Sequence, residues 1–153
     1  LARKSATRAT MTMRPALLAL LLAAAPAWAD EVLAELERRS GIPIAELQVI
    51  LEDCHRTQMS ANFCAFRDFI QADLRMRKAV EAKLASLPES CRPSLARLQA
   101  RWEKSRDARC NRHADDQAAG GSMRPMVFSD CRATQTKRRI RALDAMKGCP
   151  SPQ

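Results

Sequence analysis

Six cysteines and two histidines are the residues of this chain whose chemistry could build a metal site or a set of cross-links. They are Cys54, Cys64, Cys91, Cys110, Cys131 and Cys149, with His55 and His113. His55 adjoins one cysteine and His113 follows another by three residues, so a mixed cysteine and histidine zinc site can be drawn. Zinc sites commonly use closely spaced thiolate pairs such as Cys-x-x-Cys, and this chain has none. We therefore expect no metal ligands and six cysteines paired as disulfides.

The compartment follows from a segment at residues 11–29 that has the pattern of a cleavable secretion signal. Arg14 supplies the positive charge, Leu17–Ala25 the apolar run, and Ala27–Ala29 the small-x-small cleavage pattern. The apolar run is about half of the roughly 20 residues that a membrane-spanning helix needs. All six cysteines follow this segment, and thiols in an oxidising compartment form lasting disulfides. We expect a periplasmic or secreted protein without a stable membrane anchor.

The chain divides into three predicted parts. Residues 1–29 are upstream residues plus the signal peptide, with translation starting at Met11 or Met13; residues 30–52 are an N-terminal helical segment, and residues 53–149 a helical domain. Without residues 1–29 the chain keeps 22 basic and 17 acidic residues, so its net charge falls from +9 to +5. About 124 remaining residues suit one core. Because the chain has no tyrosine and few other aromatic residues, we expect disulfides to add stability.

Apolar residues recur three and four positions apart, which predicts an all-α fold, a small disulfide-stapled bundle of about four helices. Asp30 is the expected cap of a short helix that ends at Ser40-Gly41, and Pro43 opens another. The longest apolar stripe runs from Met59 to Leu87 and predicts a central helix. A further helix is expected from about residue 93 to 110.

The last helix is expected to start near Ser129 or Asp130, after one clear loop at Asp115–Pro125. Helix geometry also limits the disulfides: Cys54 and Cys64 are ten residues apart, or about 15 Å along an unbroken helix, whereas bridged α-carbons lie within about 7 Å. Thr57 as an N-cap would let the preceding segment double back.

Six cysteines allow fifteen connectivities, and pairing between sequence neighbours is our hypothesis among them. The favoured pairs are Cys54–Cys64, Cys110–Cys131 and Cys91–Cys149.

Several short motifs occur in an order typical of one family. They are Cys54, Cys64, Ala72–Leu74, Leu98–Trp102, Arg106-Asp107, Cys110, Gly120–Ser122, Cys131, Thr136, Arg139 and Leu143. Over about residues 53 to 146 the chain resembles the lysozyme inhibitor LprI-like (N-terminal domain) family. Cys91 and Cys149 are additional to the commoner four-cysteine pattern, and Ser60 replaces a usual acidic residue. The resemblance implies a small exported helical domain, with lysozyme as the partner of the member that names the family.

No constellation typical of an enzyme is present. Six paired cysteines leave no free thiol, no serine lies in a nucleophile elbow, and the five-residue spacing of Asp68 and Asp73 does not align them on one helical face. The chain also lacks the Cys-x-x-Cys-His of haem attachment. We expect a binding protein without a cofactor.

Local binding candidates come from the shared motifs and from the basic residues near the end of the chain. They are Trp102, Arg106, Asp107, Gly120, Gly121, Arg138 and Arg139. For Trp102 a place in the core is favoured, because Leu95 and Leu98 share its helical spacing. For Arg106-Asp107 the favoured role is to hold the glycine loop by ion pairs or hydrogen bonds, and turn geometry accounts for the glycines.

Charge limits the partner. A basic chain is repelled at long range by the common basic lysozymes. Local acids at Glu52-Asp53 or Asp115-Asp116 are therefore the candidates for contact with a basic cleft. The alternative is that these acids are only solvated surface charges. The alternative function is binding of anionic cell-wall or lipopolysaccharide polymers by the basic cluster at 137–141, which is otherwise a solvated helix face.

A less favoured alternative is a helix-turn-helix nucleic-acid binder, because the pattern from Leu33 to Ile50 resembles that motif. Glu37 occupies the turn-facing position where the motif has a small residue, and export separates the protein from DNA. No nucleic-acid partner is expected.

Overall fold

The computed structural model describes residues 26–150, and within this range it contains helices and connecting segments but no strand. The elements are α1 (Pro26–Ser40), α2 (Ile44–Leu51), α3 (Gln58–Ser86), the short 3-10 helix η1 (Glu89–Cys91), α4 (Arg92–Ala118) and α5 (Arg124–Ala145). The predicted all-α, disulfide-stapled class is confirmed. The structure has five α-helices among the described residues, where about four were expected. Most of the predicted signal segment lies outside the described residues.

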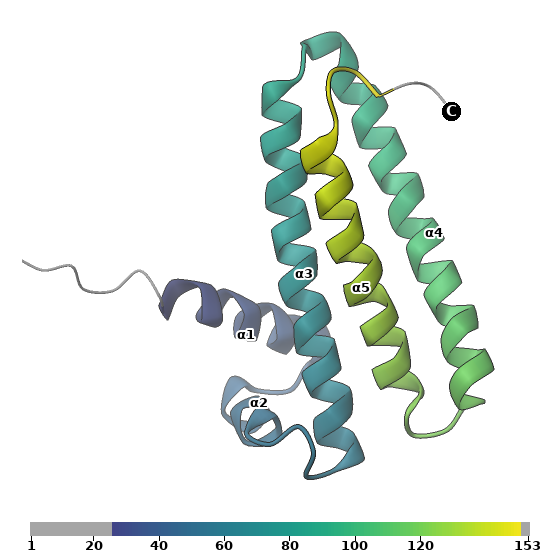
Figure 1. Cartoon of the computed structure of the whole chain (residues 1–153). Helices are drawn as coiled ribbons and strands as arrows, with labels where there is room; N and C mark the ends of the chain where they lie inside the picture. The colour runs from purple at the N-terminus through teal and green to yellow at the C-terminus, as the bar shows by residue number, and fades with distance from the viewer. Residues whose placement is uncertain (1–25, 151–153) are drawn as a thin grey trace, which may run out of the picture.

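The three long helices form the body of the molecule. Figure 1 shows α5 between α3 and α4, with α3 and α5 running in one direction and α4 in the other. The short helices α1 and α2 pack against α3. The segment between α2 and α3 and the turn between α4 and α5 therefore lie at the same end of the bundle (Figure 1). No helix among residues 26–150 has both the length and the apolar character to cross a membrane.

Two apolar clusters make up the core. The first joins α1 and α2 to α3: Leu36, Leu47 and Ile70 are fully buried in it. The second lies toward the other end of α3, where Leu95 of α4 and Leu143 of α5 are fully buried. Residues 30–52 thus share a core with the rest of the chain, since burial of apolar surface is the main force that holds helices together.

The start of α3 is determined by the residue predicted to cap it. The Thr57 side chain accepts a hydrogen bond from the Ser60 backbone N–H at 3.0 Å and so satisfies one free N–H group of the first turn. The chain doubles back before this cap and brings Cys54 within 5.8 Å of Cys64, measured between α-carbons. The expected reversal at Thr57 is therefore present.

The other two disulfides join elements that are farther apart in sequence. Cys110 of α4 is bonded to Cys131 of α5, with α-carbons 5.5 Å apart, and Cys91 of η1 is bonded to Cys149 after α5, with α-carbons 5.4 Å apart. These are the pairs favoured from the sequence. All six cysteines are in disulfides, so no free thiol remains among the described residues.

Several predicted helix ends were wrong. α1 begins at Pro26, so Asp30 lies inside the helix instead of capping it. α4 continues past the predicted end near residue 110 to Ala118, because its polar last turns still pack Ala114 inside. α5 begins at Arg124, with Pro125 in its first turn, where a proline needs no N–H partner. The expected loop at 115–125 therefore shortens to the few residues around Gly120, whose φ of 76° suits glycine.

Candidate functional site

A buried carboxylate, Asp73 of α3, lies where four helices meet. Its oxygens accept hydrogen bonds from Arg39 of α1 at 2.7 Å, from Arg77 of α3 at 3.1 Å and from Arg106 of α4 at 3.4 Å. Arg106 in turn donates to Thr136 of α5 at 3.0 Å. Burial raises the pKa of Asp73, but the hydrogen bond and charge of Arg39 and the charge of Arg106 outweigh it, so the net pKa is lowered.

Glu35 extends this network across α1. Its carboxylate accepts hydrogen bonds from Arg38 and Arg39 of the same helix, both at 2.7 Å, and from Arg77 of α3 at 3.0 Å. The pKa of Glu35 is well below its usual value. The hydrogen bond from Arg38 is the largest cause, and those from Arg39 and Arg77 add to it, although burial opposes the shift. Both acids stay ionised at neutral pH, so the network acts as fixed charge and holds α1 to the bundle.

The motif residues Arg106 and Asp107 belong to this network. Arg106 is only 4% exposed; its Nε donates to Asp107 at 2.8 Å, and its guanidinium lies over the rings of Phe69 and Trp102. No described contact links Arg106 to the glycine turn, so the prediction that this pair holds the turn was wrong. The pair lies more than two helical turns before the end of α4, because α4 is longer than predicted.

Other residues hold the turn around Gly120 and Gly121. The Asn62 side chain of α3 donates to the Ser122 carbonyl at 3.0 Å, and Arg124 donates to Asp115 at 2.6 Å. The turn is thereby tied to the first turns of both α3 and α5. The positive φ of Gly120 gives a conformational reason for the glycine, as expected from turn geometry.

Trp102 is half-buried and packs against the second apolar cluster, as favoured from its spacing. The basic residues Arg138 and Arg139 separate: Arg138 is exposed, whereas Arg139 is half-buried, donates to Gln99 of α4 at 3.0 Å and lies over the Trp102 ring. Adjacent residues on a helix point about 100° apart, so these two arginines cannot form one surface cluster.

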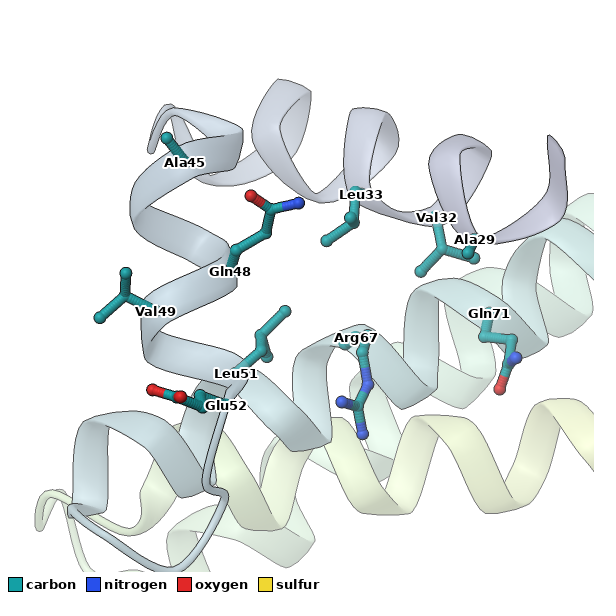
Figure 2. Close-up of a pocket in the computed structure, with 10 residues that line it drawn as sticks. All are labelled: Ala29, Val32, Leu33, Ala45, Gln48, Val49, Leu51, Glu52, Arg67 and Gln71. Atoms are coloured by element: carbon teal, nitrogen blue, oxygen red, sulfur yellow. The ribbon is translucent and has the colours of Figure 1, made fainter. Parts of the chain in front are cut away.

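A groove of about 690 Å³ opens between the short helices and α3. Figure 2 shows Leu33 of α1 and Gln48 and Leu51 of α2 turned toward its interior, while Val49 points away. Arg67 and Gln71 of α3 line its other side. The groove offers apolar contact with a polar rim, which is typical of binding sites.

Metal ligation has no basis in the described residues. The six cysteines are in disulfides, and residues 26–150 contain no group of three histidine, cysteine or acidic side chains placed to hold an ion. The residues at the centre of the charged network, Asp73 and Arg39, were not singled out as site residues. Each has an opposite charge four positions away, Arg77 for Asp73 and Glu35 for Arg39, and such pairs are ordinary on exposed helix faces, so the sequence gives no sign of burial.

Most of the helical core is similar in sequence to a known protein family. The family model described as lysozyme inhibitor LprI matches residues 52–143, which span α3, η1, α4 and most of α5. The chain belongs to this family. An uncharacterised protein of Rhizobium meliloti (strain 1021) is 30% identical over 106 residues, covering 60% of this chain and 76% of that protein. No solved structure matches.

The LprI match covers the part of the charged network that α3, α4 and α5 supply. Asp73, Arg106, Asp107 and Thr136 all fall within residues 52–143, whereas α1, which supplies Arg39, and most of the groove in Figure 2 precede it. The LprI region thus contains two of the three disulfides entirely, and the Cys91–Cys149 bond extends beyond its end.

Proposed function

We propose that this protein is exported, acts by binding and not by catalysis, and inhibits a lysozyme. The observation that carries the proposal is the LprI family match across α3, α4 and most of α5. Export is supported by three disulfides, which persist in oxidising compartments, and by the signal-like segment at residues 11–29. A binding role is supported by helices cross-linked into one rigid body, since a rigid surface loses little entropy on association.

The contact surface in this proposal is the end of the bundle where the α2–α3 segment and the α4–α5 turn lie together (Figure 1). Glu52 is 74% exposed there, only loosely paired with Arg56 at 3.9 Å, and Asp116 is exposed without a described partner. Asp115 is less available because Arg124 binds it. A few exposed acids at one end allow a basic enzyme to approach a chain that is basic as a whole.

The test is inhibition of cell-wall lysis. Purified, oxidised residues 30–153 are titrated into lysozymes of different structural classes, and the rate of lysis is followed. We expect inhibition of at least one class, which reduction and alkylation of the protein abolishes. The absence of inhibition for every class at micromolar excess would remove this proposal.

A pair of charge variants locates the contact. Glu52→Gln with Asp116→Asn removes two negative charges from the proposed end, and Glu81→Gln with Asp144→Asn removes two from exposed positions toward the other end. Loss of complementary charge slows association, so the first pair is expected to weaken inhibition by about tenfold and the second to leave it unchanged. Equal effects would place the contact elsewhere.

One observation favours a second candidate, binding of an anionic envelope polymer. Arg109 of α4 and Arg138 of α5 line the same surface groove of about 620 Å³, together with His113 and one acid, Asp130. Two guanidiniums facing one groove can bind phosphate or carboxylate groups spaced along a chain. Arg139 takes no part in this candidate, since it faces Gln99 and Trp102.

Salt dependence tests this second candidate. Binding of lipopolysaccharide or peptidoglycan fragments is expected to weaken as salt rises, because exposed charges are screened beyond about 8 Å at physiological ionic strength. Arg109→Ser with Arg138→Ser is expected to abolish it. An affinity that changes neither with salt concentration nor with these substitutions would contradict a charge-based contact.

A further inference from the structure

A third, smaller cavity lies between the N-terminal turns of α3 and α5. Its volume is about 320 Å³, and its lining residues are Asn62, Phe63, Phe66, Pro125, Phe128, Ser129 and Arg132. Three phenylalanines and a proline make its walls mainly apolar. The volume is near the lower limit of the range of about 300 to 1,000 Å³ typical of small-ligand pockets.

Arg132 is the charged residue of this cavity, and its hydrogen-bonding groups have no acceptor in the described chain. Its guanidinium carbon lies 3.9 Å from the centre of the Phe69 ring and 4.0 Å from that of Phe128. Its Nε is buried and makes no hydrogen bond, alone in this respect among the buried side-chain nitrogens and oxygens of residues 26–150. Buried donors are almost always paired, so an orphaned one calls for a partner that the chain itself does not supply.

The charges around Arg132 favour an anion. The acids of the adjoining network are Glu35, Asp73 and Asp107, and its arginines are Arg38, Arg39, Arg77, Arg106 and Arg132. Positive groups outnumber negative ones, and the acids are already bonded to the other arginines. Burial lowers the pKa of Arg132 to about 10, while Asp107 opposes the shift, so the side chain still carries its charge at neutral pH.

We propose that this cavity binds a carboxylate carried on an apolar group, with the carboxylate on the N–H edge of Arg132 and the apolar group among Phe63, Phe66 and Phe128. A guanidinium presents parallel N–H donors that match the two oxygens of a carboxylate. The phenylalanine rings exclude water from this contact, which strengthens it. The site lies wholly within the LprI region but needs no lysozyme.

Benzoate titration with detection at the Arg132 Nε–H tests the proposal on the unaltered, oxidised protein. In ¹H–¹⁵N NMR spectra, benzoate is expected to shift that resonance saturably, and neutral benzamide, which has the same shape, is not. This comparison depends on no variant. No saturable shift with benzoate, or an equal response to benzamide, would overturn the proposal.

Two variants of equal charge change then assign the site. Arg132→Gln removes the fork and is expected to weaken benzoate binding by about tenfold or more, measured in the variants from the backbone amide resonances around the cavity. Arg141→Gln removes an exposed charge from the same helix and is expected to change nothing. Circular dichroism checks that both variants fold. Unchanged affinity in a folded Arg132→Gln variant would contradict the assignment.

A comparison of two peptides shows whether the carboxylate belongs to the end of a polypeptide chain or to a free small molecule. A tripeptide that ends in phenylalanine with a free carboxylate is compared with its C-terminal amide. If the peptide with a free carboxylate binds as benzoate does and its amide does not, the pocket is assigned to the end of a polypeptide chain. If benzoate binds and neither peptide does, the pocket is assigned to a free small carboxylate. Both outcomes support the site, while displacement of benzoate by the amide would contradict the role of the carboxylate.

Discussion

At the scale of single residues, Asp73 is a buried carboxylate that accepts hydrogen bonds from three arginines. Arginines from α1, α3 and α4 share its carboxylate, and Arg106, only 4% exposed, donates to it, to Asp107 and to Thr136. A buried ion pair contributes little net stability while intact, but removing one partner leaves a charge uncompensated. The network therefore acts mainly to hold α1, α3, α4 and α5 in one arrangement.

Replacing Asp73 with asparagine is expected to lower the free energy of unfolding by about 3 to 5 kcal/mol, because three guanidiniums lose their shared anion. Urea unfolding followed by circular dichroism measures the change. Asp68→Asn is the matched control on the same helix: its pair with Arg67 is well exposed, so the expected loss is below about 1 kcal/mol. Similar losses for the two variants would contradict a structural role for the buried network.

The same substitution changes the response to acid. The pKa values of Asp73 and Glu35 are lowered by folding, so their contribution to stability is fully present above their ordinary values of about 4 and is lost as the pH falls through the lowered values. Unfolding free energy is therefore expected to fall below about pH 4, and less steeply in Asp73→Asn.

At the scale of elements, disulfides fix the places where helices begin or meet. Cys54–Cys64 holds the reversal that leads into α3, Cys110–Cys131 joins α4 to α5, and Cys91–Cys149 ties the segment after α5 to η1. Helix ends have unsatisfied backbone groups and fray most readily. Cys54–Cys64 and Cys91–Cys149 thus stabilise segments next to helix ends, whereas Cys110–Cys131 joins the interiors of α4 and α5.

Removal of each disulfide is expected to cost stability in order of loop length. In the chain-entropy model the bond across 58 residues contributes about 4 kcal/mol and the bond across 10 residues about 3 kcal/mol. Double replacement of Cys91 and Cys149 by alanine should therefore lower the unfolding free energy more than that of Cys54 and Cys64. Denaturant unfolding of the two variants measures this, and the reverse order would show that native packing outweighs loop closure.

At the scale of the whole molecule, a basic chain places some of its exposed acids at one end of the bundle. Net charge is +9 for the full sequence, yet the α2–α3 segment and the α4–α5 turn bring Glu52 and Asp116 to one end of the bundle (Figure 1). The Arg132 cavity lies between the first turns of α3 and α5, near that end. The groove of Figure 2 is formed instead by α1 and α2 on α3. Association with a basic enzyme is therefore a question of local charge and not of net charge.

By itself, the sequence determined the features that depend on near neighbours. Helical periodicity predicted the all-α class, and the Thr57 cap explained how Cys54 reaches Cys64. The order of motifs pointed to the LprI family. Helix ends were less predictable, because buried contacts extend α4 beyond the region where its sequence looks apolar.

Only the tertiary structure decided which charged residues meet. Asp73 lies 34 residues from Arg39 and 33 from Arg106 in sequence, and Arg132 meets Phe69 across two helices. The sequence contains many arginines, and nothing in it shows which are buried or what they contact. In the structure Arg106 donates to Asp73, whereas the buried Nε of Arg132 has no acceptor among the described residues. Such partners are set by how the helices pack, since a helix face is defined by its neighbours and not by its own periodicity.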